Sequence, residues 1–382
     1  MAMPSIPQFD LLPAHEQLRP EIEGAIRAAL ASGHYVGGPA VASFEAAWAA
    51  YCGAAQAVGV GNGTDALEIG LAALGIGAGD EVILPAMSYA ATAEAVVNVG
   101  ARPVFADVLE ADATLDPAAA AAAITPNTAA IIAVHLYGQP ADLASLDRLA
   151  SAQGLALIED AAQAHGAALA ERPVGGIGRF AAFSFYPSKN LGAIGDAGAI
   201  VSSDPALIER ARALRNHGQS APNQHTLVGR NSRLDTLQAA VLSVKLAQLD
   251  RWNAARVALA TAYDRALAGL PGLRLPSGRP GSRHVYHQYA LRVAAGGAFG
   301  DRDALAACLD RAGIETRVHY PAALHQLPAF AEPARPTDAP VAEAWAREEL
   351  SLPMYPELPP AQLTRVTETL RELARAGGVV RA

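Results

Sequence analysis

One lysine of this 382-residue chain stands in surroundings that are unusual for a charged side chain. Lys189 lies in the stretch FSFYPSKNLGAIGDAGAIV (residues 183–201), among glycines, small residues and hydroxyls, directly after an apolar run. An ε-amine that Phe183, Phe185 and Leu191 partly desolvate has a lowered pKa, which makes it a competent nucleophile toward a carbonyl carbon. Most lysines simply point to solvent, so this interpretation depends on partners elsewhere in the chain.

A carboxylate provides the first such partner. Asp160, in LALIEDAAQAHGA (residues 155–167), follows an apolar run at the position where open α/β sheets bind ligands. A buried carboxylate needs a cation, and a protonated ring nitrogen would serve; Gln163 could then donate to a hydroxyl on the same ring. The alternative is that Asp160 caps a following helix and that Gln163 and His165 are polar loop residues.

A turn that could bind an anion provides the second partner. In GVGNGTDAL (residues 59–67) the glycines imitate a dinucleotide fingerprint, but Thr64 stands where its third glycine belongs, and the next strand ends in Pro85 without an acid. Gly63 and Thr64 at a helix start would still present free N–H groups and a hydroxyl to a phosphate. A plain helix cap is the alternative.

Two further side chains fit the same site. Ser184 could reach the phosphate, and Tyr89 in PAMSYAATA could stack on a ring, although such a tyrosine is more often part of the core. An amine, an acid for a ring nitrogen and a phosphate cradle, in this order along the chain, are the parts of a pyridoxal 5'-phosphate (PLP) site.

The surrounding sequence predicts the elements that would position these groups. Short, nearly continuous apolar strands alternate with helices from residue 57 to residue 215, which predicts an α/β fold with a large PLP-binding domain built on a wound, mostly parallel sheet. A long helical stretch after residue 234 leads into a smaller C-terminal α+β domain. We expect an N-terminal segment and large domain over residues 1–250 and a small domain over 251–382, joined through that helix.

The small domain is predicted from four patterns. The alternation in HVYHQYALRV, residues 284–293, predicts a half-buried strand. A helix over 302–312, a strand in IETRVHY (314–320) and a helix from about 359 to 377 complete the unit. Near the N-terminus, Ile22, Ile26 and Leu30 predict one face of a helix over 20–31.

Composition excludes several classes of function. A net charge of −8 with scattered Lys and Arg argues against a nucleic-acid surface. No stretch has the roughly 20 uninterrupted apolar residues of a membrane span, and the first residues lack the pattern of a signal peptide. Cys52 and Cys308 are too few for a disulfide framework or a thiolate metal site, so we expect a cytoplasmic protein without a metal.

The sequence resembles the DegT-type nucleotide-sugar aminotransferases of the aspartate aminotransferase superfamily (fold type I). The motifs that carry the resemblance run over nearly the whole chain: SGHYVGGPAVASFE, GNGTDAL, PAMSYAATA, GARPVFADV, IEDAAQAHGA, FSFYPSKNLGAIGDAGAIV, RNHG, GRNSRLDTLQAAVL and RVHYP. The resemblance implies PLP as cofactor and Lys189 as the Schiff-base lysine and proton carrier. It implies that the other cofactor contacts come from Gly63, Thr64, Tyr89, Asp160, Gln163 and Ser184, joined by Asn231 of the neighbouring subunit in an obligate homodimer with shared active sites.

The resemblance also suggests what the site acts on. His319 and Tyr320 align with a segment that lines the sugar pocket, and Arg233 and Arg317 are candidates for the diphosphate. Relatives that act as dehydratases replace the lysine with histidine, so Lys189 favours amino transfer. Many relatives have an aromatic residue where this chain has Ser232, which resembles the branch acting on 3-keto sugars.

The implied reaction is ping-pong transfer of the amino group of L-glutamate to a nucleotide-linked keto-6-deoxyhexose, with a dTDP-linked 3-keto sugar as the specific prediction. Two alternatives stay open. One is the same chemistry on a 4-keto sugar or a cyclitol ketone. The other is a PLP-binding regulatory or partner protein without turnover.

Overall fold

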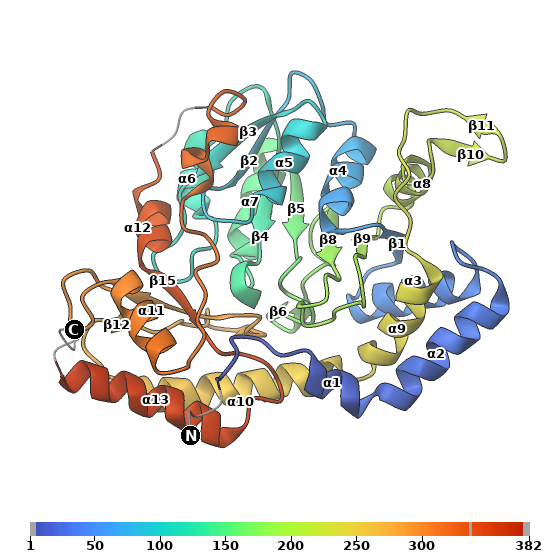
Figure 1. Ribbon diagram of the computed structural model, residues 1–382. Coiled ribbons are helices and arrows are strands. Elements are labelled where there is room, and N and C mark those ends of the chain that lie inside the picture. Colours follow the sequence, from blue (N-terminus) through green and yellow to red (C-terminus); the bar gives the residue numbers. More distant parts are fainter. Residues whose placement is uncertain (1–4, 336–337, 377–382) are drawn as a thin grey trace.

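The centre of the protein is a seven-stranded sheet (Figure 1). The computed structural model describes residues 5–335 and 338–376. The strand order is β1-β9-β8-β5-β4-β2-β3, and β9 runs antiparallel to both of its neighbours while the other strands share one direction. The bounds are β1 (Gln56–Val60), β2 (Glu81–Pro85), β3 (Arg102–Ala106), β4 (Thr128–Val134), β5 (Ala156–Asp160), β8 (Phe180–Ser184) and β9 (Gly198–Ser202). The predicted wound, mostly parallel sheet is confirmed.

The strands are apolar on both faces because helices cover both faces. In β4, for example, Ile131 packs into one hydrophobic cluster and Ile132 into the other. One face is covered by α4 (Gly63–Leu74), α5 (Ala91–Asn98), α8 (Pro205–Leu214) and α12 (Pro340–Glu348). The other is covered by α3 (Pro39–Tyr51), α6 (Pro117–Ala123), α7 (Leu143–Gln153) and α9 (Thr236–Leu246).

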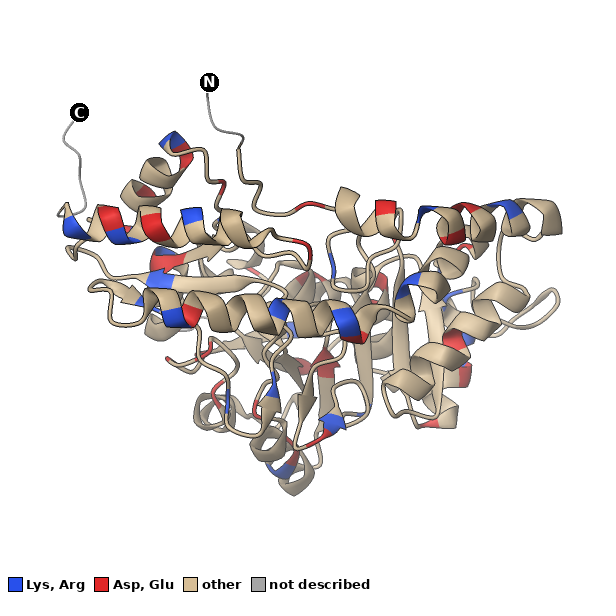
Figure 2. Ribbon diagram, turned by 90° about the horizontal axis from the view of Figure 1, so that it is seen from below, with Lys and Arg blue, Asp and Glu red and all other residues tan. Residues whose placement is uncertain are grey.

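A separate hydrophobic cluster forms around a small antiparallel sheet in the C-terminal part of the chain. The sheet consists of β12 (Leu273–Arg274), β14 (Tyr289–Val293) and β15 (Glu349–Leu352). It packs with α10 (Leu249–Leu267), α11 (Arg302–Arg311) and α13 (Pro360–Arg375). Figure 2 shows acidic and basic residues interspersed along these helices.

The predicted division into a large and a small domain at residue 250 stays a proposal. The small cluster includes Ile6 from the N-terminal segment, whereas α12 packs on the large sheet.

The predicted single helix after residue 234 is wrong, because it ends at Leu246 and restarts as α10 at Leu249. The turn at residues 247–248 has no glycine or proline, so the apolar spacing runs through the break without a signal.

Two predicted strands of the small domain also differ from the structure. Residues 284–288 are not part of the sheet, because the Val285 N–H donates to the carbonyl of Gly138 and the Gln288 N–H to that of Tyr137. All five residues of β14 are buried, so the expected half-exposed pattern is wrong. Residues 314–320 form only isolated bridges, such as that between Arg317 and Ser351. The last residue of the predicted C-terminal helix, 377, lies outside the described residues.

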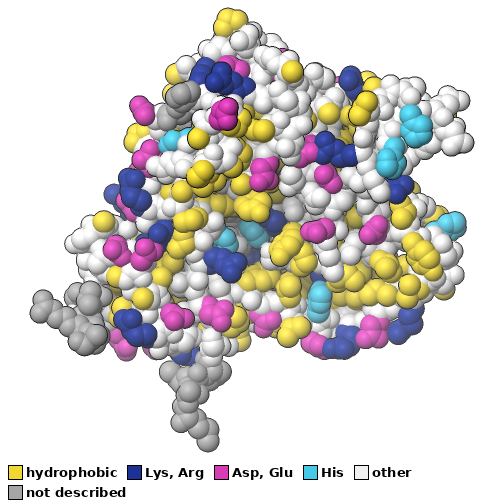
Figure 3. All heavy atoms as spheres, turned by 45° about the horizontal axis from the view of Figure 1, so that its top comes forward, with side chains coloured by type: hydrophobic (Ala, Val, Ile, Leu, Met, Phe, Trp, Pro, Cys, Tyr) yellow, Lys and Arg dark blue, Asp and Glu magenta, His cyan; other side chains and the backbone are white. Residues whose placement is uncertain are grey.

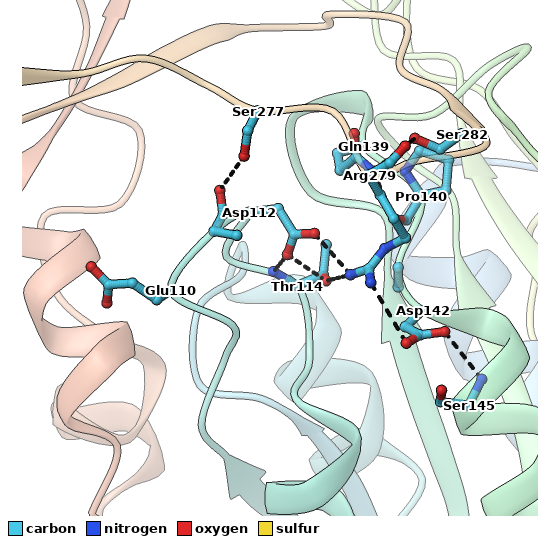
Figure 4. Close-up of polar contacts among 12 residues, drawn as sticks. Glu110, Asp112, Thr114, Gln139, Pro140, Asp142, Ser145, Ser277, Arg279 and Ser282 are labelled. Atoms are coloured by element: carbon cyan, nitrogen blue, oxygen red, sulfur yellow. Dashed lines mark hydrogen bonds and ion pairs between the residues drawn. The ribbon is translucent and has the colours of Figure 1, made fainter.

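The Pro/Gly-rich connection 271–283 is fixed to the large domain by a polar network (Figure 4). Arg279 forms ion pairs with Asp112 at 2.8 Å and with Asp142 at 3.5 Å, and its guanidinium also donates to the Thr114 hydroxyl. The Ser277 hydroxyl donates to the carbonyl of Ala111. Charged hydrogen bonds between largely buried groups hold this connection in one position.

Short elements complete the fold. These are α1 (Leu12–Gln17), α2 (Arg19–Ser32), β6 (Ala168–Leu169), β7 (Arg172–Pro173), β10 (Gln219–Ala221), β11 (Gln224–His225), β13 (Ser282–Arg283), and the 3-10 turns Leu136–Gly138, Leu324–Gln326 and Pro328–Phe330. The helix predicted over 20–31 is α2, but Leu30 is 51% exposed while Ala29 is buried instead. Within residues 5–335 and 338–376, no helix is long and apolar enough to cross a membrane.

The packing of α4 on the sheet generates a prediction. A Cβ at Gly70 would lie 2.3 Å from the ring of Phe180, which is fully buried in β8. We expect Gly70→Ala to lower the free energy of unfolding by about 1–3 kcal/mol through overpacking. Thermal and urea unfolding measure the effect.

The matched control is Gly24→Ala, at a glycine within α2, where a Cβ meets no atom within 4 Å. That substitution should leave stability unchanged or raise it by up to about 1 kcal/mol. Equal stability of Gly70→Ala and the parent protein would contradict the packing described here.

Candidate active site

A cavity of about 980 Å³ lies where the parallel strands end, at the carboxyl edge of the large sheet. Its wall also includes residues 317–320, which bridge to the small sheet. In Figure 3 histidine and basic side chains gather around a hollow near the middle of the molecule. All but two of the predicted site residues line this cavity: Gly63, Thr64, Tyr89, Asp160, Gln163, Ser184, Lys189, Arg317, His319 and Tyr320.

Lys189 lies in the turn that follows β8, with its backbone fixed and its amine free. Its N–H donates to the carbonyl of Tyr186, and the adjacent Asn190 side chain donates to Asn253 Oδ1 at 2.8 Å and to the carbonyl of Val285. Within the described part of the chain the Nζ atom has no hydrogen-bond partner. Burial lowers the pKa of Lys189 to about 8, and the charge of Asp160 opposes that shift. About a tenth of the amine is therefore neutral and nucleophilic at pH 7, far more than for an ordinary lysine with a pKa of about 10.4.

Asp160, the last residue of β5, presents its carboxylate to the cavity. Its Oδ2 accepts a hydrogen bond from the Thr92 hydroxyl at 2.8 Å, and its Oδ1 accepts one from the Ala162 N–H at 3.2 Å. Burial raises the pKa of Asp160, whereas these two hydrogen bonds lower it. No helix follows, since residues 161–167 form turns, so the helix-cap alternative does not explain this carboxylate.

Gln163 connects two segments of the cavity wall. Its Oε1 accepts a hydrogen bond from the Tyr137 N–H at 2.6 Å, and its Nε2 donates to the Tyr320 hydroxyl at 2.5 Å. Tyr137 has a φ of 57°, a left-handed conformation that is uncommon for a residue other than glycine. The strained backbone turns the Tyr137 N–H toward Gln163, which fixes the orientation of the amide at the cavity.

The predicted anion cradle is present at the start of α4. Asn62 caps the helix by accepting the Asp65 N–H at 2.8 Å, and the N–H groups of Gly63 and Thr64 have no partner within the helix. A Cβ at Gly63 would lie 2.7 Å from the Cβ of Ser184, so only glycine allows α4 and β8 to approach this closely. The two N–H groups and two hydroxyls can therefore converge on one phosphate.

Three supporting residues were missed from the sequence. The Ser88 and Thr92 hydroxyls are 2.8 Å apart and extend the hydrogen bonding of Asp160. Ser232 accepts the Gly61 N–H at 2.9 Å and donates to Asp65 Oδ2 at 2.7 Å, which holds the turn before α4. The i, i+4 spacing of Ser88 and Thr92 was the available signal for the first pair, whereas nothing in the sequence connects Ser232 with Gly61.

The remaining predicted residues differ in their exposure. Tyr89 lies at the cavity with 64% of its surface exposed, so it is not a core tyrosine. Asn231 is exposed and Arg233 donates to Asn216 Oδ1; neither lines the cavity of its own chain. His319 lines the cavity, and burial lowers its pKa to about 4, which keeps the imidazole neutral.

These groups fit PLP. A free amine, a buried carboxylate and unpaired N–H groups at a helix start are the three features that bind its aldehyde, ring nitrogen and phosphate. When bound, PLP supplies the electron sink and carries the amino group between two half-reactions. Lys189 would hold the aldehyde carbon, Asp160 the ring nitrogen, and Gly63, Thr64 and Ser184 the phosphate.

Comparisons with known proteins agree with this geometry. A dTDP-3-amino-3,4,6-trideoxy-alpha-D-glucose transaminase of Streptomyces venezuelae is 49% identical over 97% of both chains. A protein of Geobacillus stearothermophilus named as a pleiotropic regulatory protein is 44% identical over 97% of this chain and 99% of its own. The crystal structure of S. venezuelae DesV in complex with a ketimine intermediate superposes with a TM-score of 0.94, at 49% identity, over 97% of this chain and 99% of that one.

The same comparisons decide the broader predictions made from the sequence. The fold type I architecture, the aminotransferase activity and PLP as the cofactor are confirmed. The model of the DegT/DnrJ/EryC1/StrS aminotransferase family matches residues 16–371. The chain belongs to this family of aminotransferases.

Proposed function

We propose that this protein transfers the amino group of L-glutamate to the 3-keto carbon of a dTDP-linked 6-deoxyhexose. The observation that carries the proposal is the free amine of Lys189, whose pKa is lowered by burial, beside the buried carboxylate of Asp160 in a cavity of about 980 Å³. The cavity is large enough for a cofactor and a sugar nucleotide together. The 49%-identical relative that is named as a transaminase of a dTDP-3-amino sugar supports the substrate.

Each side chain would have a defined task. Asp160 would hold the ring nitrogen in its protonated form, and Thr92 favours the ionised form of Asp160 by donating to its Oδ2. Lys189 Nζ moves the proton between the substrate carbon and the cofactor, since a pKa of about 8 allows it to take and return a proton near neutral pH. Gln163 donates from its Nε2 toward the ring hydroxyl beside Tyr320.

The sugar nucleotide would bind along residues 317–320. Arg317 is an exposed cation at the cavity and suits the diphosphate, whereas the neutral His319 and the Tyr320 hydroxyl suit sugar hydroxyls. The His319 Nε2 is buried without a hydrogen-bond partner among the described residues, which leaves it available to a ligand. Arg233 would act from a partner subunit together with Asn231.

We propose a homodimer with shared active sites. The hairpin β10–β11 stands away from the rest of the protein, and a two-stranded hairpin is marginally stable alone (Figure 1). Leu30, Tyr35 and Val36 are at least half exposed, and Figure 3 shows hydrophobic side chains gathered over this N-terminal helical region. An apolar patch of this kind is typical of a subunit interface. We also propose a cytoplasmic location, in keeping with the two free cysteines.

Two alternatives remain distinguishable by experiment. A 4-keto sugar or a cyclitol ketone would use the same catalytic groups. A regulatory protein without turnover, which the name of the Geobacillus relative would suggest, has no need of a free amine with a pKa near neutrality. The intact set of Lys189, Asp160 and Thr92 favours catalysis.

The substrate is tested in the reverse direction, with dTDP-3-amino-3,4,6-trideoxy-α-D-glucose and 2-oxoglutarate, by measuring L-glutamate formed. We expect a kcat/KM at least about 100-fold higher than with a 4-amino dTDP-sugar or an aminocyclitol, because buried polar groups left unpaired by the wrong isomer oppose its binding. Preferred turnover of the 4-amino sugar would contradict the assigned position. If none of these amines is turned over, the proposed class of substrate is wrong.

The shared site is tested by mixing two variants. Asn231→Ala and Lys189→Ala are each expected to be impaired as homodimers. In a mixed dimer, the subunit that keeps Lys189 would receive Asn231 from its partner, so one site becomes complete. Refolding both variants together should restore about a quarter of the parent activity, the share given by random pairing into dimers.

If Asn231 acts within its own chain, the mixed dimer has no complete site and activity is not restored. Light scattering after gel filtration provides the accompanying measurement. A monomer in solution would contradict the shared-site proposal directly.

A further inference from the structure

The segment that faces the substrate is held in place by a buried carboxylate from the small sheet. Glu349, the first residue of β15, has no exposed surface. Its Oε2 accepts the backbone N–H of His319 at 3.1 Å, and its Oε1 accepts the Ser351 hydroxyl at 2.6 Å. The carboxylate therefore lies directly behind the part of the cavity wall formed by residues 317–320.

Few other contacts fix this segment. Arg317 and Ser351 exchange two backbone hydrogen bonds, of 3.1 and 2.8 Å, but this bridge to β15 is isolated and residues 317–320 form no strand. At the far end, the Tyr320 hydroxyl accepts from Gln163. Between these two attachments the His319 N–H has Glu349 as its acceptor, so the carboxylate sets the position of the residue in the middle.

The charged groups around Glu349 do not neutralise it. The positive charge of Arg302 in α11 lowers the pKa of Glu349 slightly, without a hydrogen bond between the two among the described residues. The Arg302 guanidinium donates instead to Asp303 and to the carbonyl of Ala346. On the adjacent strand, Arg292 is paired with Glu348 and Glu110 instead. The other titratable groups that face this region are His319, Tyr320 and Tyr137, none of which is a cation at neutral pH.

We propose that Glu349 is a positioning residue for the nucleotide-sugar substrate: its carboxylate holds residues 317–320 so that Arg317, His319 and Tyr320 face the cavity. This inference rests on the proposed function for the identity of the substrate. Glu349 does not line the cavity and touches no reacting atom, so its role is indirect.

The protonation of Glu349 supports this role. Burial raises the pKa of Glu349 from its ordinary value of 4.5 to about 7. The folded protein thus binds this proton more tightly than the unfolded chain, so the contribution of Glu349 to stability is full below about pH 4.5 and is lost as the pH rises through about 7. Above about pH 7 the ionised carboxylate opposes folding, so the position it gives to residues 317–320 explains its presence better than stability does.

Two variants separate positioning from stability. Glu349→Leu removes the acceptor, and Glu349→Gln keeps an acceptor but cannot ionise. Above pH 7 Glu349→Gln should not melt below the parent protein, because it removes the buried charge and keeps an acceptor, whereas Glu349→Leu also leaves the His319 N–H and the Ser351 hydroxyl without their acceptor. The matched control is Glu357→Gln, whose half-buried carboxyl also has a raised pKa but whose Oε2 has no hydrogen-bond partner among the described residues.

The kinetic measurement compares the effect of each variant on the reaction with the amino sugar and on the reaction with L-glutamate. With dTDP-3-amino-3,4,6-trideoxy-α-D-glucose, Glu349→Leu should raise KM about tenfold, the effect of one lost hydrogen bond to a charged group, while the half-reaction with L-glutamate changes less than about twofold. In the parent, the sugar KM should rise as the pH falls below about 7, since protonation weakens the hydrogen bond from His319. Glu349→Gln should lack that inflection, and Glu357→Gln should keep it.

The second readout needs no turnover. Hydrogen–deuterium exchange at pH 8 should be faster at the His319 amide in Glu349→Leu than in the parent or in Glu357→Gln. Unchanged exchange and unchanged sugar KM in Glu349→Leu would overturn the inference, as would an equal loss for both substrates together with a lower melting temperature. A parent protein that reacts with L-glutamate but not with this sugar would refute the proposed substrate alone, and the exchange measurement would still decide the role of Glu349.

Discussion

The amine of Lys189 and the carboxylate of Asp160 are both withdrawn from water at one edge of the sheet, and each depends on the other. Burial lowers the pKa of the lysine and raises that of the acid, so each charge is costly by itself. A cofactor with a protonated ring nitrogen and a reactive carbonyl satisfies both groups at once. The fold can be understood as the scaffold that keeps these two groups close and dry.

Backbone approach is the main structural requirement of that scaffold. The start of α4 comes so near to the end of β8 that a Cβ at Gly63 would meet Ser184, and a Cβ at Gly198 would lie 2.3 Å from the carbonyl oxygen of Asn62. Side chains at either position would separate the phosphate cradle from the lysine turn. The antiparallel strand β9 begins with Gly198 and brings it to this point.

Much of this arrangement could be predicted from the sequence because it depends on local signals. Apolar runs that end in Asp160 or Ser184, and the pair Gly63 and Thr64 that opens a helix, mark strand ends and an anion site without knowledge of tertiary contacts. Predictions failed where the outcome depended on distant partners. The break after Leu246 has no local signal, residues 284–288 bond to a turn instead of a sheet, and Ser232 reaches Gly61 across the chain. Glu349 was missed for the same reason, since its acceptor role exists only when the small sheet meets residues 317–320.

The measurement that tests the central claim most directly is the absorption spectrum of the purified, PLP-loaded protein before and after L-glutamate, beside Lys189→Ala and Lys245→Met. Lys245 is the matched control, because burial also lowers its pKa to about 8 but its Nζ donates to the carbonyl of Gly192. We predict that the yellow band bleaches in the parent and in Lys245→Met, as the amino group passes to the cofactor, and that Lys189→Ala shows no catalytic bleaching. Bleaching at the parent rate in Lys189→Ala would contradict the account.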